Sequence, residues 1–357
     1  MNPMKHFLSL AAALSLSLFP VHLAAQAPSG EGWHAEEIAQ GVQYYTFSGM
    51  EPVSGAAQQV FVIDVDLDNP RYALRFAYSP EAVTTSTVFR EKGAVAALNA
   101  AYEPSSVVIK VDGTLYSCMP SDSVLTSPVP NWKSEAAVYT DGSGNVRIGF
   151  DAKGLGLEDQ RAFYASSTAP NILSSAPMLI DDYQLVGTQF VDPSLTRDDL
   201  RKLQYEDPLR HQGVRHPRTA VALTGNRHLL MVAVDGRRKG IGEGMSAREL
   251  TLFLDRNFHP RYALNMDGGG STTLCVRGQG DPETHVVNYP TDNKAYDHAG
   301  ERKLFSHFYL AERYPAAAEE FARFGVREEV LSDWNKSSGL DRTYDLSPKP
   351  STPAPKG

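Results

Sequence analysis

The sequence predicts an α+β fold, a single large mixed domain with a strand-rich core and a few helices. Short apolar segments of strand length recur along most of the chain, and they do not alternate strictly with helical segments. Clusters of Gly, Pro, Asn and Asp separate these segments, as is typical of turns. The 357 residues are 42% hydrophobic and 21% charged, an ordinary composition for a globular protein that is long enough to bury a substantial core.

The N-terminal segment has the pattern of a signal peptide. Lys5 and His6 precede an apolar run over residues 7–19, and the small-residue sequence Ala-Gln-Ala follows at 25–27, where a signal peptidase would read it. The run is too short for a membrane span, and no later stretch reaches the roughly 18 apolar residues that a spanning helix needs. We therefore expect residues 1–27 to be removed and the protein to be exported, either periplasmic or secreted, without a membrane span.

The remaining chain divides into one domain and a tail. We expect the domain to occupy residues 28–312. Beyond it, residues 316–335 have a helical pattern, and the stretch from Ser347 onward contains four prolines. Residues 313–357 are therefore expected to form a C-terminal helix and a disordered Pro-rich tail.

The first half of the domain is predicted to contain strands and one short helix. Residues 60–65 and 72–76 have the pattern of strands joined by a turn at 68–70, and we expect these two strands to be neighbours. A helix over 86–92 and an apolar strand over 94–98 follow.

The rest of the domain is predicted to contain two hairpins and a well-marked helix. Ser246 and Glu249 have the spacing of a capping box, and Pro260 ends the apolar helical pattern that follows, which predicts a helix over 246–258. The predicted hairpins pair residues 137–139 with 146–148 and 218–223 with 228–234, and further strands are expected over 262–266, 274–276 and 304–310.

A glycine-rich run between two of these strands needs a special explanation. Residues 265–273 read Asn-Met-Asp-Gly-Gly-Gly-Ser-Thr-Thr. Three successive glycines each cost roughly 0.5–1 kcal/mol in backbone entropy relative to alanine, so they are expected where the backbone bends sharply or approaches another group closely. Asp267 lies at the exit of a strand, where it can act as an acid, a base or a metal ligand. The turn itself can direct consecutive N–H groups toward an anion such as phosphate, or it can be a plain hairpin loop.

This run, with several segments around it, resembles the phosphodiester glycosidase family. Residues 215–278, from Arg-His-Pro-Arg-Thr-Ala through Val-Asp-Gly-Arg to the glycine run, resemble the signature half of that family. The sequence Ala-Val-Ala-Ala-Leu-Asn-Ala-Ala-Tyr at 94–102 resembles the family's strand that ends in Asn-Gly-Gly-Phe/Tyr. Further likenesses, at 176–180, 288–290 and 300–302, occur in the same order as in the family, so the resemblance extends over roughly residues 40–312.

One position departs from the family pattern. Ala100 and Ala101 stand where the family usually has two glycines, and Glu103 follows Tyr102. Because alanine restricts positive φ, the loop after Asn99 is expected to take a different path or to bind a different ligand.

The resemblance implies hydrolysis of a sugar-1-phosphodiester, such as an N-acetylglucosamine-1-phosphodiester, in a phosphate-linked glycan. This reaction needs a carboxylate near the anomeric carbon and donors around the phosphate. We expect Asp267 to be the catalytic carboxylate and Arg218 to contact phosphate, because the planar guanidinium binds phosphate oxygens in pairs. Substrate or phosphate contacts are expected from the polar and glycine residues at the strand ends, namely Asn99, Asn265, Gly268, Gly269, Gly270, Ser271, Thr272, Asn288 and Arg302.

Two further acids are candidates for the reaction, each with a simpler explanation. Asp235 ends a strand in Val-Asp-Gly-Arg and is either catalytic or the first residue of an Asp-Gly turn. Glu243 lies in a Gly-rich loop and is either a second acid or a solvated side chain. Three histidines in loops, His211, His216 and His285, are candidates for acid–base work or are merely exposed.

The sequence contains no pattern that requires a cofactor, although Asp267 with a neighbouring acid is a candidate pair for a divalent cation. Cys118 and Cys275 lie in apolar, strand-like settings and are expected to be core thiols. The net charge of −8 gives no reason to expect nucleic-acid binding. The expected partner is instead a phosphorylated glycan, and the expected role is in the turnover of cell-envelope or extracellular polysaccharide.

Two other functions are compatible with the same scaffold. One is hydrolysis of an ordinary glycosidic or phosphodiester bond in cell-envelope polysaccharide, because a fold does not fix the reaction. The other is a non-catalytic module that binds glycan or phosphate, in which Ala100, Ala101 and Glu103 mark an altered site.

Overall fold

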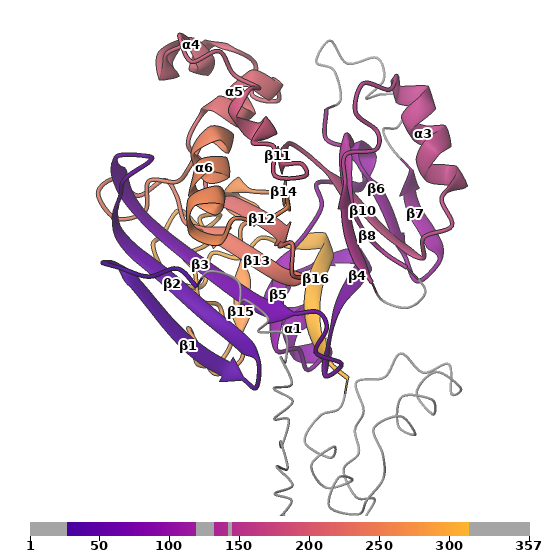
Figure 1. The fold of residues 1–357 in the computed structure, drawn as a ribbon, viewed down its shortest axis with the longest axis horizontal. Helices are drawn as coiled ribbons and strands as arrows, with labels where there is room; N and C mark the ends of the chain where they lie inside the picture. The colour runs from indigo at the N-terminus through magenta and orange to yellow at the C-terminus, as the bar shows by residue number, and fades with distance from the viewer. Residues whose placement is uncertain (1–26, 119–131, 142–144, 314–357) are drawn as a thin grey trace, which may run out of the picture.

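Three antiparallel sheets organise residues 27–118, 132–141 and 145–313, which are the residues that the computed structural model describes (Figure 1). The expected signal segment, apart from its last residue, and the expected C-terminal helix and tail lie outside the described residues. The mixed, strand-rich α+β class predicted from the sequence is confirmed.

The largest sheet of the described residues has seven strands, and two smaller sheets have four and five. In spatial order the seven strands are β1 (Trp33–Ala39), β2 (Val42–Glu51), β3 (Ala56–Asp66), β13 (His228–Val234), β12 (Arg218–Leu223), β14 (Tyr262–Asn265) and β11 (Met178–Ile180). The four-stranded sheet contains β15 (Leu274–Val276), β5 (Ala96–Asn99), β16 (Leu304–Glu312) and β4 (Tyr72–Val83). The five-stranded sheet contains β7 (Thr114–Cys118), β6 (Val108–Val111), β10 (Asn171–Ser175), β8 (Ala136–Thr140) and β9 (Val146–Gly149).

Helices cover the outer faces of these sheets. The helical elements are α1 (Thr85–Glu91), α3 (Leu157–Ser166), α4 (Arg197–Lys202), α5 (Pro208–Gly213) and α6 (Ala247–Phe258), with short 3-10 turns η1 (Pro104–Ser106), η2 (Val186–Thr188) and η3 (Gly269–Ser271). Separate apolar clusters join α6 to the seven-stranded sheet, α1 to the four-stranded sheet and α3 to the five-stranded sheet.

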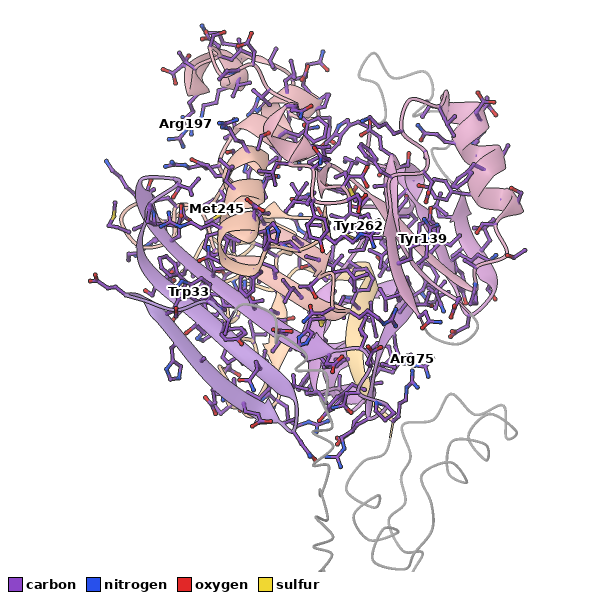
Figure 2. All side chains as sticks on the ribbon, in the orientation of Figure 1. Trp33, Arg75, Tyr139, Arg197, Met245 and Tyr262 are labelled. Carbon is purple, nitrogen blue, oxygen red and sulfur yellow. The ribbon has the colours of Figure 1, made fainter. Side chains whose placement is uncertain are left out.

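One large apolar core joins the three sheets. Ile63 of β3 faces Leu98 of β5 and Phe308 of β16 across it, as in two sheets packed face to face. The five-stranded sheet adds Val138 and Leu173 to the same core. This sheet lies to one side of the other two, with Tyr139 well apart from Met245 beside α6 (Figure 2).

The predicted capping-box helix forms as expected. The Ser246 hydroxyl accepts a hydrogen bond from the Glu249 amide at 3.2 Å, and the Glu249 carboxylate accepts one from the Ser246 amide at 2.8 Å. Leu250, Phe253 and Phe258 are buried against the sheet, and each contributes about 1.5–3 kcal/mol by leaving water.

One predicted pairing is wrong. β3 and β4 were expected to be neighbours, but β3 pairs with β2 and β13, whereas β4 pairs with β16. The physical reason is that β3 is apolar on both faces. Val62 packs under α6 and Ile63 packs in the main core, so β3 is central in its sheet and the chain then crosses the core to begin β4. The predicted hairpins β8–β9 and β12–β13 are confirmed.

The strand order brings the predicted site residues to one edge of the fold. β13 ends just before Asp235 and β14 ends just before Met266 and Asp267, while their common neighbour β12 begins at Arg218. In the facing sheet, β5 ends at Asn99 beside the start of β15.

Candidate active site

Two strand-end loops, after Asn99 and after Asn265, are joined by hydrogen bonds. The Asn99 side-chain amide donates to the carbonyl of Asp267 at 2.7 Å, and the Asp267 amide donates to the carbonyl of Ala100 at 2.9 Å. The Asn99 side-chain oxygen accepts from the Thr219 hydroxyl at 2.9 Å and from the Thr273 amide at 3.0 Å. Asn99 is fully buried and fixes the turn that carries Asp267 from both sides.

Asp267 is a buried carboxyl group that can exchange a proton near neutrality. Its exposed fraction is 9%. Burial raises the pKa of Asp267 from 3.8 to about 7, and a hydrogen bond from Ser271 opposes this rise. Glu103 raises the pKa further, while the cations Lys133 and Arg302 lower it. An acid with a pKa near the operating pH is well suited to proton transfer.

The glycines after Asp267 have separate structural reasons. A Cβ atom at Gly268 would lie 2.8 Å from the Pro217 carbonyl oxygen, which belongs to the backbone. Gly269 adopts φ +65°, a left-handed conformation that favours glycine. A Cβ atom at Gly270 would lie 2.5 Å from the Arg302 guanidinium, so a larger residue there would displace the end of that side chain. The expected nest of consecutive free amides does not form. Instead, the amide of Gly269 donates to the carbonyl of Pro217 at 2.8 Å, and those of Ser271 and Thr272 donate back into the turn at 3.2 and 3.4 Å.

Arg302 provides the cation beside this turn. It donates to the Ser271 hydroxyl at 3.2 Å, and Ser271 in turn bonds the Asp267 carboxyl group. Two other guanidinium nitrogens of Arg302 contact Asp292 at 3.2 and 2.5 Å. Its side chain is 41% exposed, so Arg302 is a charged and accessible group linked to Asp267 through one hydroxyl.

Asp235 is a second buried carboxyl group, with a different set of neighbours. One oxygen accepts from the Tyr289 amide at 2.9 Å and from the Asn288 side chain at 3.3 Å, and the other oxygen is buried without a hydrogen-bond partner. Burial raises the pKa of Asp235 from 3.8 to about 7. Asn288 also donates to the Thr272 carbonyl at 2.9 Å, which connects Asp235 to the glycine turn.

Arg218 is held by backbone carbonyls. It is fully buried and donates to the carbonyls of Met245 at 2.8 Å, His211 at 2.6 Å and Val214 at 3.1 Å. The remaining terminal nitrogen has no hydrogen-bond partner. Burial without a carboxylate lowers the pKa of Arg218 from 12.5 to about 10. In this conformation Arg218 braces the segment before β12 against the start of α6.

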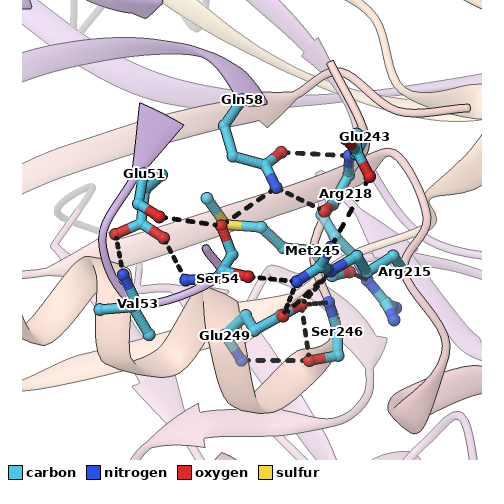
Figure 3. A network of polar contacts seen from close by, with 11 residues as sticks. Glu51, Val53, Ser54, Gln58, Arg215, Arg218, Glu243, Met245, Ser246 and Glu249 are labelled. Atoms are coloured by element: carbon cyan, nitrogen blue, oxygen red, sulfur yellow. Dashed lines mark hydrogen bonds and ion pairs between the residues drawn. The ribbon is translucent and has the colours of Figure 1, made fainter. Parts of the chain in front are cut away.

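Glu243 belongs to a separate polar network (Figure 3). Its carboxylate lies 3.7 Å from the Arg215 guanidinium and accepts the Gly240 amide at 3.2 Å. Arg215 also contacts Glu249 at 2.6 Å, so this network supports the capped end of α6. The contacts of Glu243 lie within this network, whereas those of Asp267 lie around the glycine turn.

Other predicted site residues are buried and form hydrogen bonds around the glycine turn. The Asn265 side chain donates to the carbonyls of Met266 at 2.7 Å and Ala176 at 3.1 Å and to the Tyr102 hydroxyl at 3.3 Å. Thr272 is buried, and its hydroxyl lies 3.2 Å from that of Thr219; because Thr219 donates its one proton to Asn99, Thr272 is the donor in this contact. Burial lowers the pKa of His211 well below its usual range and that of His216 to about 3, so both rings are neutral at pH 7.

The departure at Ala100 and Ala101 has a structural explanation. Neither residue adopts positive φ, and both methyl groups pack in the main core. The Ala100 amide donates to the Ser306 carbonyl at 3.2 Å and the Ala101 amide to the Ser306 hydroxyl at 3.1 Å. Alanine therefore fits this loop without strain.

Sequence reasoning missed a charged group near Asp267. Lys133 lies 2.7 Å from Glu206 and 3.8 Å from Glu103, and its ammonium group is 4.7 Å from the centre of the Tyr102 ring. The only signal in the sequence for this group of side chains was the departure from the family pattern at Tyr102 and Glu103. Lys133 itself comes from a Ser- and Pro-rich region without a motif.

The two cysteines of the described residues form no disulfide with each other. Cys118 and Cys275 are both free; Cys275 is a buried core thiol as predicted, whereas Cys118 is only partly buried. In the described ranges, no three His, Cys, Asp or Glu side chains are grouped to hold a metal ion. No helix in that part of the chain has the length and apolar character needed to span a membrane.

Comparison with known proteins identifies the family. The chain is similar to the catalytic domain of zebrafish N-acetylglucosamine-1-phosphodiester alpha-N-acetylglucosaminidase, a structure auto-inhibited by its pro-peptide. The two share 16% identity over 80% of this chain and 86% of that one, with a TM-score of 0.51. A hypothetical protein from Synechocystis shares 15% identity over 79% of this chain and 64% of that one, with a TM-score of 0.47. No curated protein shows significant similarity to the chain.

The family model for phosphodiester glycosidases matches residues 92–311, more than half of the chain. The matched range begins just before β5 and ends within β16, so it contains Asn99, the glycine turn, Asp235 and Arg302. This range, together with the buried carboxyl groups and the adjacent cation, supports an enzyme and not a passive module. The chain belongs to the phosphodiester glycosidase family and is a phosphodiester glycosidase.

Proposed function

We propose that the protein hydrolyses a sugar-1-phosphodiester bond of the N-acetylglucosamine-1-phosphodiester type in a phosphate-linked glycan, with Asp267 as the catalytic carboxylate. The observation that carries this proposal is the link from Arg302 through Ser271 to Asp267. A guanidinium that could bind phosphate thus lies close to a carboxyl group with a pKa of about 7, which supports the proposal. The name of the zebrafish relative supports the choice of sugar.

In the proposed reaction, the bond between the anomeric carbon and the phosphate oxygen breaks. Water supplies the hydroxyl group of the released sugar, and the acceptor keeps its phosphate as a monoester. A phosphate monoester is a good leaving group, so its negative charge needs stabilisation more than it needs a proton. Arg302 provides this stabilisation, because the guanidinium matches phosphate oxygens in geometry and charge. Asp267 acts in its ionised form at the sugar carbon, directly or through water.

Other residues have supporting roles in this proposal. Ser271 and the turn Gly268–Gly270 bring Arg302 and Asp267 together. Asn99 and Asn265 hold the loop beneath Asp267, and Asn288 holds it from the side of Thr272. Asp235 positions Asn288, and Arg218 braces the start of β12. Glu243 pairs with Arg215, which supports a structural role for Glu243.

We propose that this reaction takes place outside the cytoplasm, in the periplasm or after secretion. Support comes from the N-terminal sequence, where an apolar run is followed by Ala-Gln-Ala at 25–27. Cell-envelope and extracellular polysaccharides are then the accessible phosphate-linked glycans. Fractionation of cells that express the full chain, with mass spectrometry of the mature N-terminus, tests this point. A product found in the cytoplasm with Met1 retained would contradict it.

The activity is tested with two substrates that share the sugar. UDP-N-acetylglucosamine has the sugar linked through its anomeric oxygen to a substituted phosphate, as in the sugar-1-phosphodiester, and p-nitrophenyl α-N-acetylglucosaminide has the same sugar without phosphate. We expect hydrolysis of the first to release N-acetylglucosamine and UDP, with kcat/KM at least about tenfold above that for the second, because binding of phosphate favours the transition state. Release of the sugar from neither substrate, or an unaltered rate in Asp267→Asn, would contradict the proposal.

A further inference from the structure

A second guanidinium group, that of Arg237, lies against the glycine turn. A Cβ atom at Gly269 would lie 3.0 Å from a terminal nitrogen of Arg237, and one at Gly270 would lie 2.5 Å from a terminal nitrogen of Arg302. Consecutive Cα atoms are about 3.8 Å apart, so the two cations meet adjacent residues of one turn. Arg237 follows β13 and Arg302 precedes β16, so segments remote in sequence bring them together.

Two adjacent residues hold these two cations. The Thr291 hydroxyl accepts a hydrogen bond from Arg237 at 2.9 Å, and the Asp292 carboxylate accepts from Arg302 at 2.5 and 3.2 Å. A hydrogen bond from Arg302 lowers the pKa of Asp292, burial opposes this, and the charges of Arg302 and Arg237 lower it further. Both guanidinium groups therefore act on the same carboxylate.

The residue after Arg237 is also an arginine, but its side chain has a different environment. The Arg238 guanidinium lies over the ring of Tyr296, 5.3 Å from the ring centre. The Tyr289 ring stacks on those of Tyr296 and His298, with ring centres 4.2 and 4.5 Å away. Arg238 thus packs on a group of stacked rings, whereas Arg237 contacts the glycine turn.

Arg237 has more donors available for a ligand than Arg302. Arg302 directs three nitrogens to Ser271 and Asp292. Arg237 is exposed and directs one nitrogen to the neutral Thr291. In the described part of the chain, no carboxylate forms an ion pair with Arg237. Because a guanidinium group has five N–H donors, Arg237 keeps several of them for an anion.

The backbone at Arg237 does not follow the preference of its side chain. Its φ of +64° is left-handed, a conformation that is uncommon for residues other than glycine and costs free energy. Residues held in such conformations cluster at ligand-binding and active sites. The fold alone would favour glycine here, so an arginine at this position is consistent with a role for its guanidinium group.

We propose that Arg237 and Arg302 together bind the phosphate group of the substrate, and that Arg237 determines the preference for substrates with a phosphate. Arg237 donates to two phosphate oxygens, because its planar fork matches them in spacing. Arg302 supplies a second positive charge on the side of Asp267. This inference rests on the proposed function for the identity of the substrate, but the phosphate site can be measured without turnover.

The binding test uses the full chain and isothermal titration calorimetry with inorganic phosphate. We expect saturable, one-to-one binding that Arg237→Ala weakens at least about tenfold, because charged hydrogen bonds to the anion are lost. Arg238→Ala is the matched control, since it removes the same charge from the next residue. Its affinity should stay within about twofold of the wild type. Equal weakening in the two variants, or no saturable binding to the wild type, would overturn the proposal.

A second variant separates binding from folding. Arg237→Gly removes the guanidinium group and suits the left-handed backbone, so its melting temperature should equal or exceed that of the wild type. Its affinity for phosphate should nevertheless fall like that of Arg237→Ala, and Arg237→Lys should keep part of the affinity. An Arg237→Gly variant that binds phosphate as the wild type does would refute the role of Arg237.

Kinetics then distinguishes this inference from the proposed function. Arg237→Ala should lower kcat/KM on UDP-N-acetylglucosamine at least about tenfold and leave the p-nitrophenyl sugar nearly unchanged. If the wild type hydrolyses neither substrate while phosphate binding depends on Arg237, the proposed function fails and the phosphate site stands. If the wild type hydrolyses UDP-N-acetylglucosamine and Arg237→Ala does so equally well, the role of Arg237 fails and the proposed function stands.

Discussion

Asp235 and Asp267 stand at the ends of two strands of one sheet and look alike at first. Both are buried, and burial raises the pKa of each to about 7. Their neighbours differ. Asp235 accepts hydrogen bonds from the neutral Asn288 and Tyr289. The pKa of Asp267 is instead affected by the charges of Glu103, Lys133 and Arg302. Asp235 has 1% of its surface exposed and Asp267 has 9%.

This difference teaches that a raised pKa does not by itself mark the reacting group. Desolvation raises the pKa of a structural carboxyl group and of a reactive one alike. The reactive group is distinguished by the charges and the access around it, because a reaction needs a partner for the developing charge. The structure provides that partner beside Asp267, in the form of Arg302. We therefore propose that Asp267 is the reacting group and that Asp235 has a positioning role.

The largest expected effect separates the two aspartates directly. Asp267→Asn should reduce kcat on UDP-N-acetylglucosamine by about 10³-fold or more, because the substitution removes the reacting carboxylate and keeps its shape. Asp235→Asn should reduce kcat by only about tenfold, since asparagine can still accept from Tyr289. Steady-state kinetics measures both. Equal losses in the two variants would mean that both carboxyl groups take part in the chemistry.

The next effect tests the cation that distinguishes the two sites. Arg302→Ala should reduce kcat/KM on UDP-N-acetylglucosamine by roughly 10²-fold and leave the p-nitrophenyl sugar nearly unchanged, because only the first substrate has a phosphate for the guanidinium. Arg302→Lys should recover part of the loss. Arg261→Ala, which removes an exposed ion pair with Asp182, is the control. A similar loss on both substrates would indicate that Arg302 only supports the fold.

The third effect is on the pH dependence of kcat/KM, which should change about tenfold per pH unit below the pKa of Asp267. The proposed reaction needs ionised Asp267, whose pKa is about 7. The rate constant kcat/KM should therefore rise with pH up to about 7 and then level off, because the ionised fraction grows as the proton leaves. The Asp235→Asn variant should keep this rising limb. A rate that falls as pH rises from 5 to 7 would mean that the protonated form of Asp267 reacts.

Much of this site could be predicted from the sequence, because its residues lie at strand ends that periodicity and turn signals locate. Asp267 follows a short apolar strand and Asn99 ends a similar one, and both residues were expected to belong to the site; the structure joins them by a hydrogen bond. The local signals could not show where a guanidinium points. Arg218 begins a strand as predicted, but its side chain bonds the carbonyls of Met245 and His211.

The rest depended on long-range packing. Lys133 approaches Tyr102 and Glu206 from a region of the chain with no motif. Strand β3 is central in its sheet, between β2 and β13, because both of its faces are apolar. The local sequence pattern predicted instead that β3 pairs with β4. The free amides expected in the glycine turn were taken by carbonyls such as Pro217. In each case, the deciding partner is remote in sequence.

The smallest expected effect concerns stability and again separates the two aspartates from ordinary surface acids. Because the pKa of Asp235 is about 7 when folded and about 3.9 when unfolded, the folded state holds the proton between these values. The free energy of unfolding should therefore fall as pH rises from about 4 to 7. Asp235→Asn removes this loss, so the variant should exceed the wild type by about 1–3 kcal/mol at pH 8 and by little near pH 4. Chemical denaturation at the two pH values measures it, with the exposed Glu91→Gln as the control. A variant less stable than the wild type at pH 8 would mean that ionised Asp235 is stabilised by its surroundings, and the contrast with Asp267 would then rest on Arg302 alone.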